Sequence, residues 1–448
     1  MNLKQKNVLK PIIEPFQRFS RIEASSGILL IAATIVALVW ANSRWSDHYF
    51  ELFNDELTIQ IGSLFKLSKP LILWINDGLM GIFFFVVGLE IKREVMLGEL
   101  SSFKQASLPI FAAIGGMLMP ALLFTVMHGS QPGHEGWGVP MATDIAFSLG
   151  ILSLLGKRVP VSLKIFLTAF AIADDLGAVL VIAFFYSSQI YWNMILIAMG
   201  IYIVLWLLMY FGVRNWFVFF IFGTAVWYYF LKSGIHPSFA GVMLAMIVPV
   251  GRKIRVRAFS RLMNQNLDVF CTDECADQVM LTREQMASVD NMENYIEAVQ
   301  SPLQNLEHRM HGFVSFFVMP VFALANAGII LGGGGESLIT PLTMNIALAL
   351  LIGKIAGILG FSWLGVKLKL AVLPERTKWI HITGLGLLGG IGFTMSLFIA
   401  GLAYHESMQF LNQAKIGVIL GSLVAGIAAF VVLRMTLKPQ SEPSRKNP

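Results

Sequence analysis

The sequence predicts an all-α polytopic membrane protein with about twelve transmembrane helices. Hydrophobic residues make up 56% of the 448-residue chain and charged residues only 13%, whereas a soluble domain carries roughly 25% charged residues. Apolar runs of about 17 to 26 residues recur from Gly27 to the C-terminus, and each can cross a hydrocarbon core of roughly 30 Å as a helix. Basic residues gather in alternate connections between these runs, as they do on the cytoplasmic side of a membrane.

The apolar runs organise the chain into two groups of helices. They divide it into a cytoplasmic N-terminal segment (1–24), helices 1–8 (25–250), a long cytoplasmic loop (251–311), helices 9–12 (312–433) and a cytoplasmic tail (434–448). The first segment lacks the short apolar core and cleavage site of a signal peptide, so the first run is expected to stay as a helix. The predicted spans are 25–42, 71–90, 106–127, 136–155, 161–186, 192–211, 216–231, 236–250, 312–331, 344–365, 379–402 and 415–433.

The distribution of Lys and Arg predicts the orientation of the chain. With the N-terminus inside, the cytoplasmic segments hold 27 of the 33 basic residues, so both termini are expected in the cytoplasm. A basic rim that faces anionic lipid headgroups accounts for the net charge of +6, and no nucleic-acid partner is implied. The six remaining basic residues are Arg44, Lys66, Lys69, Lys232 and Lys415 in outer segments and Lys354 within a span.

Two connections have recognisable features. The loop 251–311 opens with basic residues and continues as polar sequence, and its composition over 281–310 predicts a surface helix in a solvated connector, with regulation left open. Its Cys271 and Cys275 have no second Cys or His pair at a ligand spacing, so neither a disulfide nor a metal site is expected. In the first outer loop, Leu57–Leu67 alternates apolar and polar residues, which predicts a short β-hairpin that could pair with another protomer.

Two spans, the fourth and the eleventh, are poor straight helices. The fourth contains Pro140 followed by Met-Ala-Thr-Asp, and the eleventh contains a run of glycines. Both spans are therefore expected to unwind near mid-membrane. Helices 3–5 and 10–12 enter the membrane in opposite senses, so the triplets could be inverted repeats with the interrupted helix in the middle. Paired interruptions point to a transporter's ion site, although each could be a functionless kink. The glycines of the eleventh span are Gly384, Gly386, Gly389, Gly390 and Gly392.

Four ionisable residues, Asp144, Asp174, Asp175 and Lys354, lie near the centres of predicted spans. Each costs roughly 2.5 to 3.5 kcal/mol at the bilayer centre, and the four together on the order of 10 to 14 kcal/mol if unpaired. One Asp–Lys pair could serve only to join helices, but a single lysine cannot neutralise three carboxylates. The remaining acids must bind ions or protons or face water, which marks an ion or proton pathway.

Asp174 and Asp175 are predicted to have different partners, because adjacent helical residues point about 100° apart. One of the two carboxylates can pair with the lysine while the other binds ions. Hard oxygen ligands suit a small alkali cation, and a bound cation competes with a proton for the same carboxylate. If the site is exposed alternately to the two sides, this competition exchanges one ion for the other.

Several motifs closely resemble the NhaA-type sodium/proton antiporter family over nearly the whole chain. Two of these motifs contain the aspartates, one contains the lysine and one contains the glycine run. Four further motifs lie elsewhere in the chain. They are Ala142-Thr-Asp-Ile-Ala-Phe147, Ala173-Asp-Asp-Leu-Gly-Ala178, Leu351-Ile-Gly-Lys354, Gly389-Gly-Ile-Gly-Phe-Thr-Met-Ser396, Asn76-Asp-Gly-Leu-Met80, Val87-Gly-Leu-Glu-Ile-Lys-Arg-Glu94, Lys232-Ser-Gly-Ile-His236 and Phe322-Ala-Leu-Ala-Asn-Ala-Gly328.

The resemblance implies roles for individual residues. Asp174 and Asp175 would form the Na⁺ and proton site, with Asp175 the main cation ligand and Asp174 paired with Lys354. Asp144 and Thr143 would sit where the interrupted helices cross, and Asp144 and Lys354 would offset the partial charges of the facing helix ends. A cytoplasmic cluster would switch transport on at alkaline pH, although the connector before Glu307 looks longer than is usual in the family. Its members would be Glu90, Arg93, Glu94, Glu307, His308 and His311.

The activity implied is electrogenic exchange of internal Na⁺ or Li⁺ for external protons across the bacterial inner membrane, in the service of pH and sodium homeostasis. The resemblance implies a homodimer formed through the hairpin and no chemical cofactor. Three alternatives stay open: an intramembrane aspartyl protease, a channel, and an exchanger for K⁺ or a small organic ion. The adjacent aspartates argue against the protease, and the core lysine with the paired interrupted helices argues against an open pore.

Overall fold

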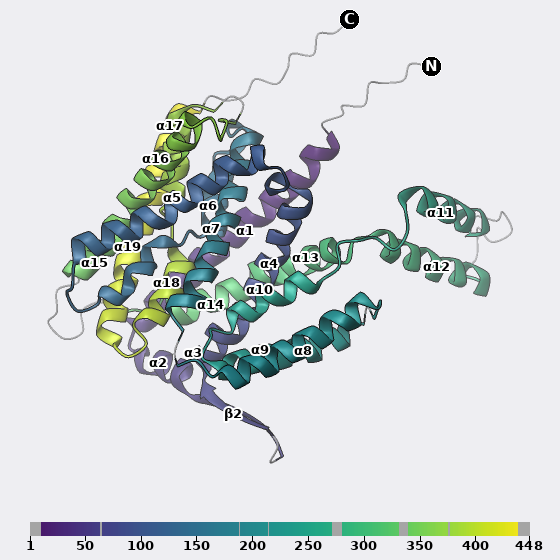
Figure 1. Ribbon diagram of the computed structural model, residues 1–448, viewed down its shortest axis with the longest axis horizontal. Coiled ribbons are helices and arrows are strands. Elements are labelled where there is room, and N and C mark those ends of the chain that lie inside the picture. The colour runs from purple at the N-terminus through teal and green to yellow at the C-terminus, as the bar shows by residue number, and fades with distance from the viewer. Residues whose placement is uncertain are drawn as a thin grey trace, which may run out of the picture.

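The protein is a bundle of long helices with one small β-hairpin, as predicted (Figure 1). The computed structural model describes residues 10–62, 65–187, 189–213, 215–270, 280–330, 339–374 and 377–437. The beginning of α1 and the end of α19 lie at one end of the bundle, and α2 and the hairpin lie at the other (Figure 1).

In the first part of the chain, up to the long loop, the described residues form ten α-helices. Short π or 3₁₀ turns interrupt or extend several of them. The elements are α1 (Lys10–Ala41), α2 (Ser46–Asn54), β1 (Glu56–Ile61), β2 (Phe65–Pro70), α3 (Leu71–Trp74), η1 (Ile75–Leu79), α4 (Met80–Leu97), η2 (Glu99–Ser101), α5 (Phe103–His128), η3 (His134–Met141), α6 (Ile145–Leu154), η4 (Gly156–Arg158), α7 (Val161–Phe185), α8 (Trp192–Tyr210), α9 (Trp216–Ser233) and α10 (Ser238–Ile247).

The second part contains the helices of the long loop and those that complete the bundle. They are α11 (Val256–Phe270), α12 (Arg283–Val299), α13 (Pro302–Phe313), η6 (Val314–Val318), α14 (Met319–Asn326), α15 (Pro341–Leu348), η7 (Ala349–Gly353), α16 (Lys354–Lys367), α17 (Trp379–Gly389), α18 (Phe393–Ala403) and α19 (Met408–Thr436).

Length and composition support a multi-pass membrane protein. Among the described residues, eight helical segments are long and apolar enough to span a membrane, and two bent pairs raise the number to ten. One pair is Ser25–Ala41 with Ser46–Asn54, bent by 113°, and the other is Trp379–Gly389 with Phe393–Ala403, bent by 46°. The two other predicted spans correspond to the short α10 and to the run α13–η6–α14, so a total of twelve stays a prediction.

Both predicted interruptions are present. The backbone is extended at Ala142 and Asp144, which separates the 3₁₀ segment η3 from α6. In the eleventh span, Gly390–Gly392 separates α17 from α18. Each break stands in the middle of a predicted triplet, namely α5, η3–α6 and α7 on one side and α15–η7–α16, α17–α18 and α19 on the other.

The first helices of the two triplets, α5 and α16, cross with their backbones in direct contact. A Cβ atom on Gly115 would lie 2.2 Å from the carbonyl oxygen of Gly357, and one on Gly357 would lie 2.0 Å from the carbonyl oxygen of Gly115. Only glycine at both positions permits this approach. The crossing brings Lys354, one turn from Gly357, close to the broken helices.

The β-hairpin of the first outer loop is also present. Strands β1 and β2 pair antiparallel with Ile59 opposite Leu67. Leu57 and Ile59 are exposed, so an apolar surface of this hairpin is open to a partner. The short helix α2 before the hairpin was not predicted.

The long loop folds as a helical hairpin, α11 and α12, that projects away from the bundle (Figure 1). The predicted surface helix is α12, which begins with a capping box between Thr282 and Gln285 and ends before Pro302 begins α13. The backbone N–H groups of Lys253 and Ile254 both donate to the Ala298 carbonyl, so the two ends of this helical hairpin lie side by side. Cys271 and Cys275 lie outside the described residues.

Candidate functional site

The two breaks lie against each other in the centre of the bundle. The Asp144 N–H donates to the Ile391 carbonyl at 2.7 Å, and the Thr143 hydroxyl donates to the Gly389 carbonyl at 2.9 Å. Thr143 is 0% exposed and Asp144 is 1% exposed. Carbonyl and amide groups that lose their helical partners at one break are therefore satisfied by the other break, as they must be away from water.

Asp144 caps two half-helices at once. Its carboxylate accepts a hydrogen bond from the Phe147 N–H at the beginning of α6, at 3.1 Å. It also accepts from the N–H of Thr394 at the beginning of α18, at 3.1 Å, and from the Thr394 hydroxyl. Because helix N-termini carry partial positive charge, one carboxylate stabilises both ends.

Lys354 and Asp174 form a fully buried ion pair beside the crossing. The Lys354 Nζ donates to both carboxylate oxygens of Asp174, at 3.0 and 3.1 Å, and to the Thr143 hydroxyl at 2.8 Å. Both charged residues are 0% exposed. The π-helical turn η7 directly precedes Lys354, and such turns often occur at functional sites.

Asp175 is buried next to this pair but has a different environment. It is 3% exposed, and in the described part of the chain its carboxylate accepts no hydrogen bond and pairs with no cation at contact distance. The negative charges of Asp174, Glu90 and Asp144 act on it, and the positive charge of Lys354 opposes them. The site therefore holds three acids against one lysine, and a cation or a proton is needed to balance the Asp175 charge.

The residues predicted to sense pH are only partly together. Arg93 lies 3.1 Å from a Glu94 carboxylate oxygen and 3.2 Å from a Glu307 carboxylate oxygen. Burial raises the pKa of Glu307, the positive charges of Arg93 and His311 oppose that rise, and Glu94 adds to it. The negative charge of Glu90 also acts on Asp175 in the aspartate site.

His308 stands apart from the other predicted sensors. It is exposed, and no partner for it is found among the residues that the structure describes. Among the predicted sensors, the structure brings at least Arg93, Glu94, Glu307 and His311 together.

Three hydroxyl-bearing residues at the crossing had been given no role from the sequence. Thr394 binds Asp144 as described, Ser148 donates to the Leu388 carbonyl at 2.8 Å, and Ser396 donates to the Val139 carbonyl at 2.7 Å. Each fastens one broken helix to the other. The signal available in the sequence was their position within one turn after each interruption, where hydroxyls can satisfy freed carbonyls.

A second polar cluster, also without an assigned role, lies near the β-hairpin. Lys69 at the end of β2 forms an ion pair with Asp77 at 2.8 Å, and the His236 Nε2 lies 3.5 Å from the other Asp77 oxygen. Asp77 stands in the π-helical turn η1, which belongs to the second span. This cluster connects the hairpin to the transmembrane bundle.

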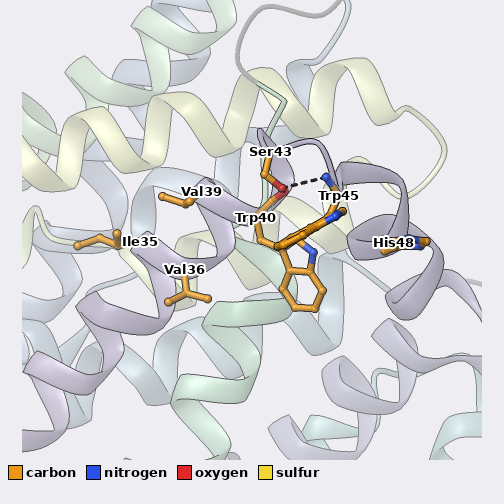
Figure 2. Close-up of a pocket in the computed structure, with 7 residues that line it drawn as sticks. All are labelled: Ile35, Val36, Val39, Trp40, Ser43, Trp45 and His48. Atoms are coloured by element: carbon orange, nitrogen blue, oxygen red, sulfur yellow. Dashed lines mark hydrogen bonds between the residues drawn. The ribbon is translucent and has the colours of Figure 1, made fainter.

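The aspartate site is separate from a large apolar cavity at the end of α1. This cavity of about 660 Å³ lies where α1 turns into α2, and the Ser43 hydroxyl accepts from the Trp45 N–H at its rim (Figure 2). Its walls bear no carboxylate, and exposed side chains such as Val36 and Val39 form part of them. The lining residues are Ile35, Val36, Val39, Trp40, Ser43, Trp45 and His48.

Comparison of the sequence with known proteins assigns the chain to one family. The family model described as Na⁺/H⁺ antiporter 1 matches residues 17–433. A protein of Oleidesulfovibrio alaskensis named Na(+)/H(+) antiporter NhaA is 47% identical over 97% of this chain and 96% of its own length. A protein of Bacteroides thetaiotaomicron with the same name is 45% identical over 95% of this chain and 98% of its own length. The chain therefore belongs to the Na⁺/H⁺ antiporter 1 family, whose relatives bear the name NhaA.

Proposed function

We propose that this protein exchanges internal Na⁺ or Li⁺ for external protons electrogenically across the bacterial inner membrane, with both termini in the cytoplasm. Membership of an antiporter family makes it a secondary transporter and not an enzyme, which sets the protease alternative aside. The observation that carries the proposal is Asp175, a buried carboxylate to which the described residues offer no counter-ion at contact distance, beside Asp174, which is paired with Lys354. Such a group requires either a cation or a proton.

The coupling follows from competition at these carboxylates. With Lys354 engaged by Asp174, an ionised Asp175 attracts Na⁺, for which carboxylate oxygens and the freed carbonyls at the crossing are suitable hard ligands. A proton on the same carboxylate removes its charge and releases the cation. Exposure to the outer side favours protonation and Na⁺ release, and exposure to the inner side favours the reverse. The cycle needs no chemical cofactor.

Electrogenic exchange links the cycle to the membrane potential. Each net charge that crosses is worth roughly 2.3 kcal/mol per 100 mV. The three acids of the site outnumber its single lysine, so it can carry different total charge when loaded with protons and when loaded with sodium. The proton-motive force would then drive sodium out, which serves pH and sodium homeostasis.

The experiment that tests this proposal uses the full chain in proteoliposomes with an acid interior and a pH-sensitive dye. Addition of Na⁺ or Li⁺ is expected to collapse the gradient, whereas choline is not. Asp175→Asn is expected to abolish the response, and the matched control Asp290→Asn, an exposed aspartate on α12, is expected to retain it.

The other outcomes separate the alternatives. A collapse of the gradient by K⁺ alone would support cation/proton exchange but would show that the substrate is K⁺ and not Na⁺ or Li⁺. A cation flux without proton movement would indicate a channel. An unchanged response in Asp175→Asn would remove the carboxylate from the mechanism.

We further propose that the chain forms a homodimer in the lipid bilayer through its β-hairpin. The exposed Leu57 and Ile59 on β1 and the free strand edges support this arrangement. Because the acids and Lys354 all belong to one chain, the dimer is expected to support transport without completing the site. Replacement of the hairpin by a short linker should give monomers in native mass spectra, and persistent dimers would refute this role.

A further inference from the structure

Two tyrosine hydroxyls clasp η3, the first half of the interrupted fourth span. Tyr186, which follows α7, donates to the Glu135 carbonyl at 2.8 Å and accepts from the Gly138 N–H at 3.0 Å. Tyr404, which follows α18, donates to the Gly133 carbonyl at 2.6 Å. The clasp therefore joins η3 to the ends of two other helices.

The backbone of η3 is shaped around these hydroxyls. A Cβ atom on Gly136 would lie 1.8 Å from the Tyr404 hydroxyl oxygen, and one on Gly138 would lie 2.7 Å from the Tyr186 hydroxyl oxygen. Neither position could bear a side chain while its tyrosine stays in place. Trp137 between them stacks on the Tyr186 ring, with centroids 6.0 Å apart. Tyr404 is only 4% exposed.

The three clasped elements all carry residues of the ion site. The segment η3 leads directly into Thr143 and Asp144, α7 carries Asp174 and Asp175, and α18 carries Thr394. The turn from α18 to α19 lies at the end of the bundle that bears α2, opposite the beginning of α1 and the end of α19 (Figure 1). Tyr404 directly follows α18 and therefore belongs to this end. With both termini in the cytoplasm, this is the outer end.

We propose that Tyr186 and Tyr404 form an outer latch, which holds η3 against α7 and α18 and must release when the ion site opens to the outside. This inference rests on the proposed antiport function and names two positioning residues for it. The three hydrogen bonds of these hydroxyls are of ordinary strength. This strength suits a latch that must open and close, because alternating access requires two states of similar free energy. A covalent or much stronger tie would trap one state.

The test removes each hydroxyl and keeps its ring, in Tyr404→Phe, Tyr186→Phe and the double variant. Tyr210→Phe, at an exposed position on α8, is the matched control. The net contribution of one hydrogen bond corresponds to about a twofold to tenfold change in an equilibrium. The apparent KM for Na⁺ is expected to rise by that factor on the inner side and to fall on the outer side, measured in vesicles of both orientations.

A second readout does not depend on exchange. Met141→Cys, on a buried position of η3, is introduced after Cys271 and Cys275 have been replaced by Ser, and its reaction with a membrane-impermeant thiol reagent is followed from outside. Each phenylalanine variant is expected to raise this rate about twofold to tenfold. If the chain did not exchange Na⁺ for protons, the KM assay would fail while this rate would still test the latch.

A third variant forces the latch apart sterically. Gly136→Ala places a methyl group where the Tyr404 hydroxyl lies and should raise the same thiol rate, whereas Gly200→Ala, with open space around it on α8, should not. Unchanged thiol rates in all latch variants would overturn the proposal. Equal losses of affinity on both sides with a lowered Tm would also overturn it, because that pattern belongs to a structural role alone.

Discussion

At the scale of single residues, the site consists of one buried ion pair and acids that the pair leaves uncompensated. Asp174 and Lys354 satisfy each other at 3.0 Å, and Asp144 is satisfied by two helix N-termini. Asp175 alone lacks such partners within the described structure. Three chemically identical side chains in one buried site therefore have three different surroundings, and groups with different surroundings can take different functions.

The ion pair gives the first prediction. Lys354→Met leaves Asp174 buried without its partner and is expected to cost about 3–5 kcal/mol of stability. Asp174→Asn combined with Lys354→Met removes both charges and should cost less than the sum of the single changes. Thermal unfolding in detergent measures these effects, with Lys367→Met on the exposed side of α16 as control. Additive effects in the double variant would show that the two residues do not interact.

The raised pKa of Glu307 gives a second prediction. Because burial raises this pKa, the carboxyl keeps its proton to a higher pH than usual and ionises as the pH increases, which strengthens its contact with Arg93. Glu307→Gln stays neutral at every pH, so the rise of transport with pH that the resemblance predicts should become shallower in this variant. Dye assays from about pH 4.5 to 9 measure the profile, because this interval begins near the ordinary pKa of a glutamate and includes the histidine range. A profile identical to that of the exposed control Glu293→Gln would exclude Glu307 from pH control.

The sequence predicted the charged residues of the site better than their neutral partners. Asp144, Asp174, Asp175 and Lys354 are identifiable because charge inside an apolar run is costly and rare. A hydroxyl such as that of Thr394 is common in membrane helices, and its hydrogen bond depends on a helix 250 residues away in the sequence. Long-range contacts of this kind are not encoded in any local pattern.

At the scale of elements, the backbone contact between α5 and α16 gives a third prediction. Gly357→Ala would place a Cβ 2.0 Å from the Gly115 carbonyl oxygen and force the helices apart, at a cost of about 1–3 kcal/mol or more. Gly360→Ala on the same helix has open space around it and should be neutral or stabilising by up to about 1 kcal/mol. Unfolding in detergent measures the stabilities of the two variants. Equal stabilities would mean that α5 and α16 can separate enough for a methyl group with no loss of stability.

The elements that the sequence identified have local causes. Pro140 and the glycine run interrupt helical hydrogen bonding at places that the sequence predicts. The alternation of apolar and polar residues over Leu57–Leu67 predicted the hairpin. The helix α2 and the π-helical turns were missed. A π turn differs from its surroundings by one residue of register, which hydrophobic periodicity does not detect.

At the scale of the whole molecule, the helical hairpin α11–α12 is an appendage with adjacent ends. The N–H groups of Lys253 and Ile254 reach the Ala298 carbonyl, and the hairpin projects beyond the bundle (Figure 1). Excision of 256–296 with a short Gly-Ser linker should therefore leave Na⁺/H⁺ exchange within about twofold of the full chain, since few contacts are lost. Loss of exchange in a variant with unchanged Tm would indicate that the hairpin regulates transport.

The glycine contact between α5 and α16 also has a mechanical consequence. Gly115 stands at the middle of α5 and contacts the backbone of Gly357 directly, with the side chains of Phe361 and Met119 packed beside the contact. At 1.5 Å per residue each arm of α5 extends for about 20 Å, so a rotation of about 10° about the contact would carry the arm ends about 3–4 Å. A rotation of the two triplets about this contact would therefore displace the nearby aspartate site least, and would displace the ends of the helices at the two membrane surfaces most.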